Sequence, residues 1–112
     1  MDFYSYDANI DAIFFKSENY EYAYSIELTG GIILDLNKTE DVIGLEILDA
    51  SKNLNIDKNY FKNTSKVNAN IQVKESNIII SLTFISDQAM KTFESFVKGF
   101  YSDKLESSFI TA

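Results

Sequence analysis

The stretch Asp35 to Glu46, DLNKTEDVIGLE, carries oxygen-bearing side chains at spacings that suit a hard cation. Asp35, Asn37, Thr39 and Glu46 fall at positions one, three, five and twelve of a calcium-binding helix–loop–helix loop. Two neighbouring carboxyl groups could also work as an acid–base pair. The stretch is therefore a candidate site for Ca²⁺ or Mg²⁺, structural or weakly catalytic.

The residues on either side favour a β-hairpin over a calcium loop. A calcium loop needs a helix on each side and a glycine at its sixth position, where this chain has Glu40. Instead, apolar side chains recur at every second position, which indicates two strands. Folding the segment about Thr39 and Glu40 gives three facing apolar pairs: Ile32 with Ile47, Leu34 with Leu45, and Leu36 with Ile43.

In this hairpin Asp35 and Glu46 should lie diagonally on one face, with Gly44 between them. A divalent cation or a shared proton could then join the two carboxyl groups. The simpler interpretation is a solvated face on which Lys16 or Lys38 neutralises one of them.

The rest of the chain predicts an α+β fold. Short β-rich segments cover residues 3–6, 12–16, 20–28, 66–74 and 78–85, Gly30 and Gly31 predict a two-residue hairpin turn, and a short helical turn should follow Asp49. After Ser86, a good N-cap, apolar side chains recur every three or four residues, which predicts an amphipathic helix. We expect an antiparallel twisted sheet of about six or seven strands, with this C-terminal helix packed on one face.

A chain of 112 residues has the size of one domain. We divide it into a hairpin module at 1–54, an extension with a hairpin and the helix at 55–101, and a frayed tail at 102–112. No apolar run is long enough to span a bilayer, and the N-terminus lacks a signal pattern. We therefore expect a cytoplasmic protein that does not bind membranes.

The composition excludes several kinds of catalytic site. The chain has no cysteine and no histidine, so it cannot supply a thiolate nucleophile, an imidazole base or a zinc site built on those residues. We predict that the chain is not an enzyme. We also predict no cofactor, unless the 35–46 hairpin binds Ca²⁺ or Mg²⁺.

The charge is distributed unevenly along the chain. The net charge is −7, but residues 1–50 hold eleven acids and two lysines, whereas residues 51–112 hold six acids and eight lysines. All ten basic residues are lysine, so arginine, the preferred side chain for phosphates and base edges, is absent. This pattern disfavours direct nucleic-acid binding and favours a basic protein partner. A homo-oligomer is compatible with it.

The acidic half also holds five of the seven tyrosines, at positions 4, 6, 20, 22 and 24. Tyrosine beside acid suits the binding of a basic protein, because the ring gives contact area and the hydroxyl a hydrogen bond. Alternatively, the tyrosines at positions 20, 22 and 24 form the core face of a strand. The nearby acids Asp7 and Asp11 flank a turn, where we expect them to make structural hydrogen bonds. The candidate binding residues are Tyr4, Tyr6, Tyr22, Glu21, Glu27 and Asp41.

Two segments, YDANIDAIFF (6–15) and GIILDLNKTEDVIGLEILDAS (31–51), resemble domain-of-unknown-function family 2283. Asn37 stands where the family has Asp, and Thr39-Glu40 where it has Asp-Gly, so we expect the tight turn to relax into a loop from Lys38 to Asp41. The matching residues are Tyr6, Asp7, Asp11, Ala12, Asp35, Gly44, Glu46, Ile47, Leu48, Asp49, Ala50 and Ser51.

The resemblance implies an antitoxin-like or inhibitor-like role, because family members resemble the neighbours of small toxin-like ribonucleases. The expected partner is then such a ribonuclease or another basic, nucleic-acid-binding protein. Together with the charge pattern, this predicts a small acidic protein-binding module. The divalent-cation site on the 35–46 hairpin is the alternative.

Overall fold

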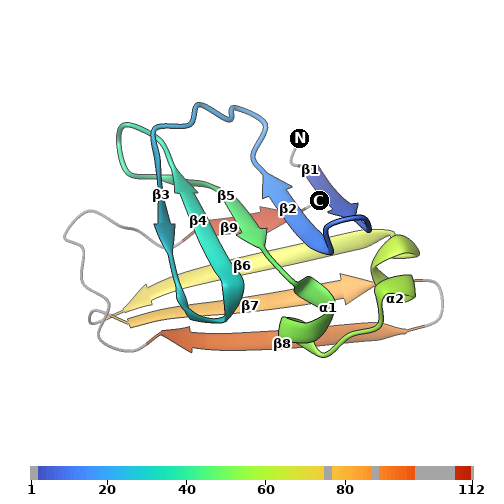
Figure 1. Ribbon diagram of the computed structural model, residues 1–112. Helices are drawn as coiled ribbons and strands as arrows, with labels where there is room; N and C mark the ends of the chain where they lie inside the picture. Colours follow the sequence, from blue (N-terminus) through green and yellow to red (C-terminus); the bar gives the residue numbers. More distant parts are fainter. Residues whose placement is uncertain (1–2, 75–76, 87–88, 98–107, 112) are drawn as a thin grey trace.

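The computed structural model describes residues 3–74, 77–86, 89–97 and 108–111, and it shows two antiparallel β-sheets packed face to face (Figure 1). The described part of the chain contains nine strands and two short α-helices. The predicted α+β fold, with a single sheet of about six or seven strands and a long C-terminal helix, is therefore wrong. The observed architecture is a β-sandwich, in which each sheet buries the apolar face of the other.

The first sheet holds the acidic half of the chain. Its five strands lie in the order β1-β2-β5-β4-β3, so β1 and β3 form its edges. The strands are β1 (Phe3–Asp7), β2 (Ala12–Lys16), β3 (Tyr24–Glu27), β4 (Ile32–Leu36) and β5 (Val42–Ile47). A 3₁₀ turn, η1 (Thr29–Gly31), joins β3 to β4, and Gly30 and Gly31 both adopt positive φ there. The predicted hairpin is thus present, but its turn has three residues and not the two that the glycine pair predicted.

The second sheet is built from the extension. Its strands lie in the order β8-β7-β6-β9. They are β6 (Lys66–Lys74), β7 (Asn77–Ile85), β8 (Met90–Val97) and β9 (Ser108–Thr111). The predicted hairpin of 66–74 with 78–85 is confirmed by the pairing of β6 with β7 from Lys66–Ile85 to Lys74–Asn77, although Asn77, which we expected in the turn, is already part of β7.

One continuous core lies between the sheets, because every second side chain of the central strands points inward. Tyr4 and Phe84, from different sheets, meet edge to face with ring centroids 6.3 Å apart. The intervening residues of the first sheet, including Asp35, Gly44 and Glu46, therefore lie on its outer face. The fully buried inward residues include Ile13, Phe15, Leu34, Leu45, Ile47, Val67, Ala69, Ile71, Ile78, Ile80, Leu82 and Phe84.

The two helices connect the sheets. The helical turn predicted after Asp49 is confirmed as α1 (Ala50–Leu54), whereas α2 (Lys58–Lys62) lies in a stretch that we expected to be loop. The Asp57 carboxylate caps α2 by accepting a hydrogen bond from the Asn59 N–H at 2.8 Å. No helix in the described ranges has the length and apolar character needed to cross a membrane.

The predicted 32–47 hairpin is confirmed, with a correction at its turn. Leu34 pairs with Leu45 and Ile32 with Ile47, as expected, but a register shift pairs Leu36 with Val42 instead of Ile43. The Asn37 N–H donates to the Asp41 carbonyl at 3.1 Å, so the loop is one residue shorter than predicted. Glu40 takes a positive φ of 63°, which closes the loop without a glycine.

The predicted C-terminal helix is replaced by a strand. Residues Met90–Val97 form β8, which pairs with β7 in a register that places Phe93 opposite Leu82. The sequence of this segment, MKTFESFV, is rich in aromatic and β-branched residues, which suit a strand. Without β8, the backbone N–H and C=O groups on one side of β7 would lack hydrogen-bond partners. Pairing with β7 therefore stabilises this segment as a strand more than its apolar spacing stabilises a helix. Asp87, Phe100 and the rest of 98–107 lie outside the described residues.

The segment predicted to be a frayed tail also contains regular structure. Residues Ser108–Thr111 form β9, which pairs with β6 from Asn68–Thr111 to Ile71–Ser108. This pairing gives one edge of β6 its backbone hydrogen-bond partners.

Candidate functional site

The outer face of the first sheet brings Asp35 and Glu46 together as predicted. Asp35 in β4 lies directly opposite Gly44 in β5, and Glu46, two residues further along β5, lies opposite Ile33. The two carboxyl groups are therefore diagonal neighbours, and they share a hydrogen bond.

Asp35 is a buried acid that accepts hydrogen bonds from two hydroxyl groups. Only 1% of its surface is exposed. One carboxyl oxygen accepts from the Ser25 Oγ at 2.8 Å, and the other accepts from the Tyr20 hydroxyl at 3.1 Å. Ser25 lies opposite Asp35 in the β3–β4 register, so the strand pairing itself supplies this partner. These neutral donors satisfy the buried carboxyl group without a basic residue.

Gly44 makes room for this arrangement. A Cβ atom at position 44 would lie 3.0 Å from an Asp35 carboxyl oxygen and 3.0 Å from the Tyr20 ring. These distances are shorter than ordinary carbon contacts, so any side chain would displace the ring or the carboxyl group. The absent side chain therefore lets Tyr20 lie over the carboxyl pair.

Glu46 holds a proton more tightly than an ordinary glutamate. Partial burial, the hydrogen bond with Asp35 and the charge of Asp35 raise the pKa of Glu46 to about 7, although Lys16 acts in the opposite direction. The Lys16 amine lies 5.1 Å from the centre of the Tyr20 ring, in a cation–π contact. Burial and the hydrogen bond to Asp35 likewise raise the pKa of the Tyr20 hydroxyl to about 12.

The pair can hold one proton between two carboxyl groups near neutral pH. A cation would have to displace this proton and compete with the hydrogen bonds from Ser25 and Tyr20. Asn37, the third residue of the predicted cation site, instead accepts three hydrogen bonds within its turn, from the Thr39 N–H, the Thr39 hydroxyl and the Asp41 N–H, each at 3.0 Å. No group of three or more acids suited to a metal ion occurs among the residues that the structure describes.

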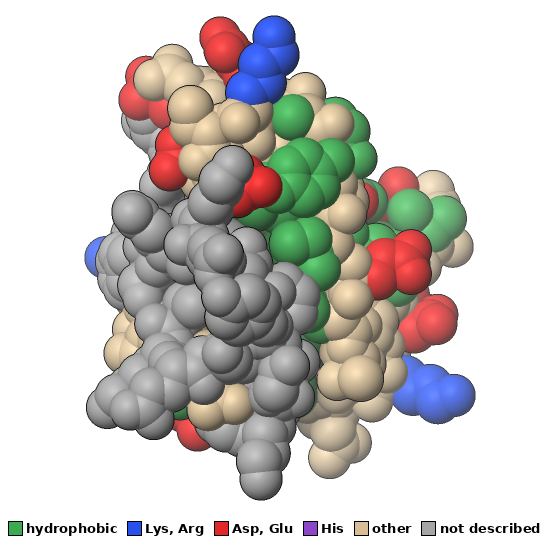
Figure 2. All heavy atoms as spheres, turned by 90° about the vertical axis from the view of Figure 1, so that its left-hand side faces the viewer, with side chains coloured by type: hydrophobic (Ala, Val, Ile, Leu, Met, Phe, Trp, Pro, Cys, Tyr) green, Lys and Arg blue, Asp and Glu red, His purple; other side chains and the backbone are tan. Residues whose placement is uncertain are grey.

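Exposed tyrosines and acids gather at one end of the same sheet. We call this group the tyrosine–acid surface: Glu21 and Tyr22 from the β2–β3 connection, Tyr24 from β3, and Glu40 and Asp41 from the β4–β5 loop. Tyr22 is 54% exposed and Tyr24 is 38% exposed. Figure 2, which views the molecule from the side of β3, shows hydrophobic side chains, tyrosine included, beside acidic ones.

Hydrogen bonds hold both tyrosines of this surface in place. The Tyr24 hydroxyl donates to the Glu40 carboxylate at 2.8 Å, and the hydroxyls of Tyr22 and Ser25 are 2.7 Å apart. The rings of Tyr20 and Tyr22 stack with centroids 6.3 Å apart. A hollow of about 240 Å³ lies between the β2–β3 connection and the β4–β5 loop, and it is lined by Glu21, Tyr22, Asn37, Lys38 and Thr39. The tyrosine–acid surface is therefore ordered and partly concave.

The other predicted binding residues lie elsewhere. Tyr4 packs against Phe15 and Phe84, with its ring 5.4 Å from that of Phe15. Tyr6 packs against Phe61 at 5.0 Å. Both tyrosines therefore support the core instead of lining the tyrosine–acid surface. Glu27 is exposed at the far end of β3.

Tyr6 also takes part in a latch between the β1–β2 turn and α1. The Asp11 carboxylate accepts hydrogen bonds from the Ser51 hydroxyl at 2.6 Å, the Ser51 N–H at 3.2 Å and the Tyr6 hydroxyl at 2.7 Å. Burial raises the pKa of Asp11, but these hydrogen bonds and the charge of Lys58 outweigh it, so the pKa lies below its ordinary value. Asp7 accepts a hydrogen bond from the Asn9 N–H at 2.9 Å, which confirms its predicted role in the turn.

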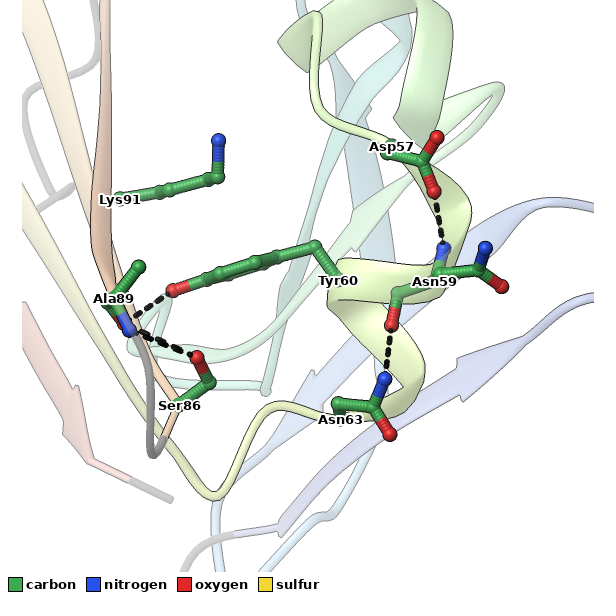
Figure 3. Close-up of a pocket in the computed structure, with 7 residues that line it drawn as sticks. All are labelled: Asp57, Asn59, Tyr60, Asn63, Ser86, Ala89 and Lys91. Atoms are coloured by element: carbon green, nitrogen blue, oxygen red, sulfur yellow. Dashed lines mark hydrogen bonds between the residues drawn. The ribbon is translucent and has the colours of Figure 1, made fainter.

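A second hollow, of about 600 Å³, lies between α2 and the start of β8 (Figure 3). Its polar groups are engaged in local structure: Asp57 caps α2, the Asn63 amide donates to the Asn59 carbonyl at 2.9 Å, and the Tyr60 hydroxyl is 2.8 Å from the Ala89 carbonyl. The Lys91 amine lies over the Tyr60 ring, 5.3 Å from its centre. These contacts tie α2 to the second sheet.

Sequence reasoning missed the hydroxyl partners of Asp35. Ser25 could have been found by extending the hairpin register to β3, because it falls opposite Asp35. Tyr20 could not, because residues 20–23 lie outside β3, and alternation would have placed Tyr20 on the same face as Ile26.

Comparison with known proteins agrees with the resemblance. Residues 4–51 match the model of a family described as "Protein of unknown function (DUF2283)". A Methanosarcina mazei protein named "Putative hypoxanthine phosphoribosyltransferase" is 40% identical over 79 residues, which are 70% of this chain and 63% of that protein. The chain thus spans less than two thirds of that relative's length. No solved structure shows a significant match.

The matched segment contains the carboxyl pair, the tyrosine–acid surface and the latch. The first part of the chain, residues 4–51, therefore matches the DUF2283 family of proteins of unknown function, in agreement with the resemblance.

Proposed function

We propose that this chain is a small protein-binding module that presents the tyrosine–acid surface to a basic protein partner. The observation that carries the proposal is that Tyr22 and Tyr24 are exposed, yet their hydroxyls are fixed by hydrogen bonds beside acidic side chains. A fixed, exposed ring loses little conformational freedom on binding, so more of its contact energy becomes affinity.

The charges of this surface support a basic partner. Glu21, Glu40 and Asp41 outnumber Lys38, and no ion pair joins Glu21 or Asp41 to a lysine within the described ranges. Acids that lack a partner of opposite charge attract a basic protein and accelerate its encounter. An antitoxin-like or inhibitor-like role, with a basic nucleic-acid-binding protein as the partner, agrees with this surface.

The relative's name raises the possibility of phosphoribosyl transfer. A phosphoribosyl donor carries several negative charges, which proteins bind with glycine-rich loops, helix N-termini or basic clusters. The tyrosine–acid surface is negatively charged, as such a donor is, and would repel it, so we propose binding and not transfer. Formation of a nucleotide from hypoxanthine by the purified chain would overturn this choice.

The test of the proposal begins with capture of the partner from cells of the source organism, followed by binding kinetics with the purified partner. The double variant Glu21→Gln/Asp41→Asn should lower the association rate, because exposed charges steer the encounter and salt screens them over about 8 Å. Tyr22→Ala should mainly raise the dissociation rate.

Glu94→Gln is the matched control, since it removes one acid from the second sheet. It should leave both rates unchanged. An association rate that is insensitive to salt and to the double variant would show that the acids serve solubility only.

A further inference from the structure

We propose that the basic partner binds by adding a β-strand to the edge of β3. This inference rests on the proposed function, and it specifies the partner segment as an extended chain in which lysines alternate with apolar residues. The argument comes from the backbone of β3, from its side chains and from the charges around it.

The backbone of β3 leaves hydrogen-bonding groups available on one side. The Leu28 N–H donates to the Ile32 carbonyl at 2.7 Å, so Leu28 and, two residues earlier, Ile26 point their backbone groups toward β4. The N–H and C=O groups of Ser25 and Glu27 must then point away from β4. Because β3 is the last strand of its sheet in the described part of the chain, these groups face outward and can pair with an added strand.

The side chains leave this edge open. Tyr24, Ser25 and Glu27 are exposed, and only Ile26 is half-buried, where it packs against the core. Edges that resist pairing usually carry lysine, proline or a bulge. The strand YSIE contains neither lysine nor proline. By contrast, the β8 edge of the second sheet carries Lys91, which would repel a basic segment.

The two faces of β3 define the partner sequence. Ser25 and Glu27 lie on the outer face, whereas Ile26 packs against the core and Tyr24 lies on the same side. In an added strand, a residue opposite Glu27 shares its face, so lysine is favoured there by charge. The intervening residues meet Ile26 and Tyr24, which favours apolar side chains such as valine.

The experiment uses a short labelled peptide that alternates lysine and valine, with binding to the full chain followed by fluorescence anisotropy. In an antiparallel pair, the backbone N–H groups of its lysines face β3 and those of its valines face away. Peptides that carry N-methyl groups on the backbone amides of the lysines should bind about tenfold more weakly or worse, because main-chain hydrogen bonds are lost. A peptide methylated on the backbone amides of the valines is the matched control, and its affinity for the chain should fall much less.

A second pair of variants tests the same edge from the protein side. Glu27→Pro removes an outward N–H and leaves the β3–β4 hydrogen bonds in place, as edge strands allow. Glu27→Gln removes only the charge. Glu27→Pro should weaken peptide binding about tenfold relative to Glu27→Gln. Far-ultraviolet circular dichroism reports whether the proline variant is folded, and the methylated peptides decide the matter if it is not.

The outcomes separate the two proposals. Equal binding of both methylated peptides overturns strand addition but leaves a basic partner in place, because attraction of the charges alone would then account for binding. Failure of the lysine–valine peptide to bind, or equal binding of a glutamate–valine peptide, overturns strand addition together with the proposed preference for a basic partner.

Discussion

The proton shared by Asp35 and Glu46 gives a sharp test of the outer-face geometry. The pKa of Glu46 is raised from 4.5 to about 7, so the folded state binds this proton more tightly than the unfolded state does. Stability from this proton is then present in full below the unfolded pKa of 4.5 and is lost as the pH rises toward 7. The protein should therefore become less stable between about pH 5 and about pH 8.

The size of the effect follows from the shift. If the whole shift counted, the loss would be about 3 kcal/mol. Because much of the Glu46 carboxyl group is in contact with water, screening reduces this to about 1–2 kcal/mol. The variant Glu46→Gln cannot ionise, and its amide can donate a hydrogen bond to Asp35 at any pH. The free energy of unfolding of this variant should therefore not show the loss that ionisation of Glu46 causes in the wild type. Above about pH 7 the variant should be more stable than the wild type.

The measurement is urea unfolding followed by far-ultraviolet circular dichroism across this pH range. Glu27→Gln is the control, because it removes an exposed acid from the same face and should leave the pH dependence intact. An undiminished loss of stability in Glu46→Gln would refute the idea that this carboxyl pair holds the proton.

Three further variants test the packing. Leu34→Ala should lower the free energy of unfolding by about 2–5 kcal/mol in urea unfolding, because the side chain is fully buried, and a change of a few tenths would contradict the hairpin register. Gly44→Ala should cost about 1–3 kcal/mol by displacing Tyr20, and a shift of the Tyr20 ring signals in the NMR spectrum should accompany it. Asp11→Asn should lower the free energy of unfolding by about 1–3 kcal/mol at neutral pH, because it weakens the hydrogen bonds to Ser51. Below about pH 4 the wild type should lose more stability than this variant, because the pKa of Asp11 is lowered in the folded state and its protonation then favours unfolding.

The hairpin was predictable because two independent constraints agree on it. The apolar alternation fixes which residues face inward, and the pairing of Leu34 with Leu45 fixes the register along the strands. The diagonal position of Asp35 and Glu46 follows from these two facts alone. The sequence paired Leu36 with Ile43 and not with Val42 because we did not expect Glu40 to adopt a positive φ. In hairpin turns this conformation is most common for glycine and asparagine.

The C-terminal segment was not predictable in the same way. Apolar residues at Met90, Phe93 and Val97 match a helical period, but the period extends over too few turns to exclude a strand. The outcome depends on β7, whose edge must find a backbone partner and which lies next to this segment in the chain. Tertiary pairing therefore decided the structure of residues whose local pattern was ambiguous.

The position of Tyr20 over Asp35 could not be predicted from the sequence, for a different reason. A strand pattern that continued from Ile26 back to Tyr20 would have placed the tyrosine in the core. Instead β3 begins at Tyr24, and Tyr20 donates to Asp35 from the outer face. What made this geometry possible was the missing side chain of Gly44, which sequence reasoning noted only as a gap between the two acids.

The family match ends at Ser51, but the apolar face of the first sheet is covered by residues that follow it. Phe15 and Leu34 are fully buried in a core that also includes Val67 and Ile80 of the second sheet. A sheet with one apolar face must bury that face against another layer. In this chain the inner face of the matched segment is therefore committed to folding. A partner that recognises the matched segment therefore has to use surfaces other than this inner face, such as the outer face or the β3 edge, where the carboxyl pair, the exposed tyrosines and the outward backbone groups lie.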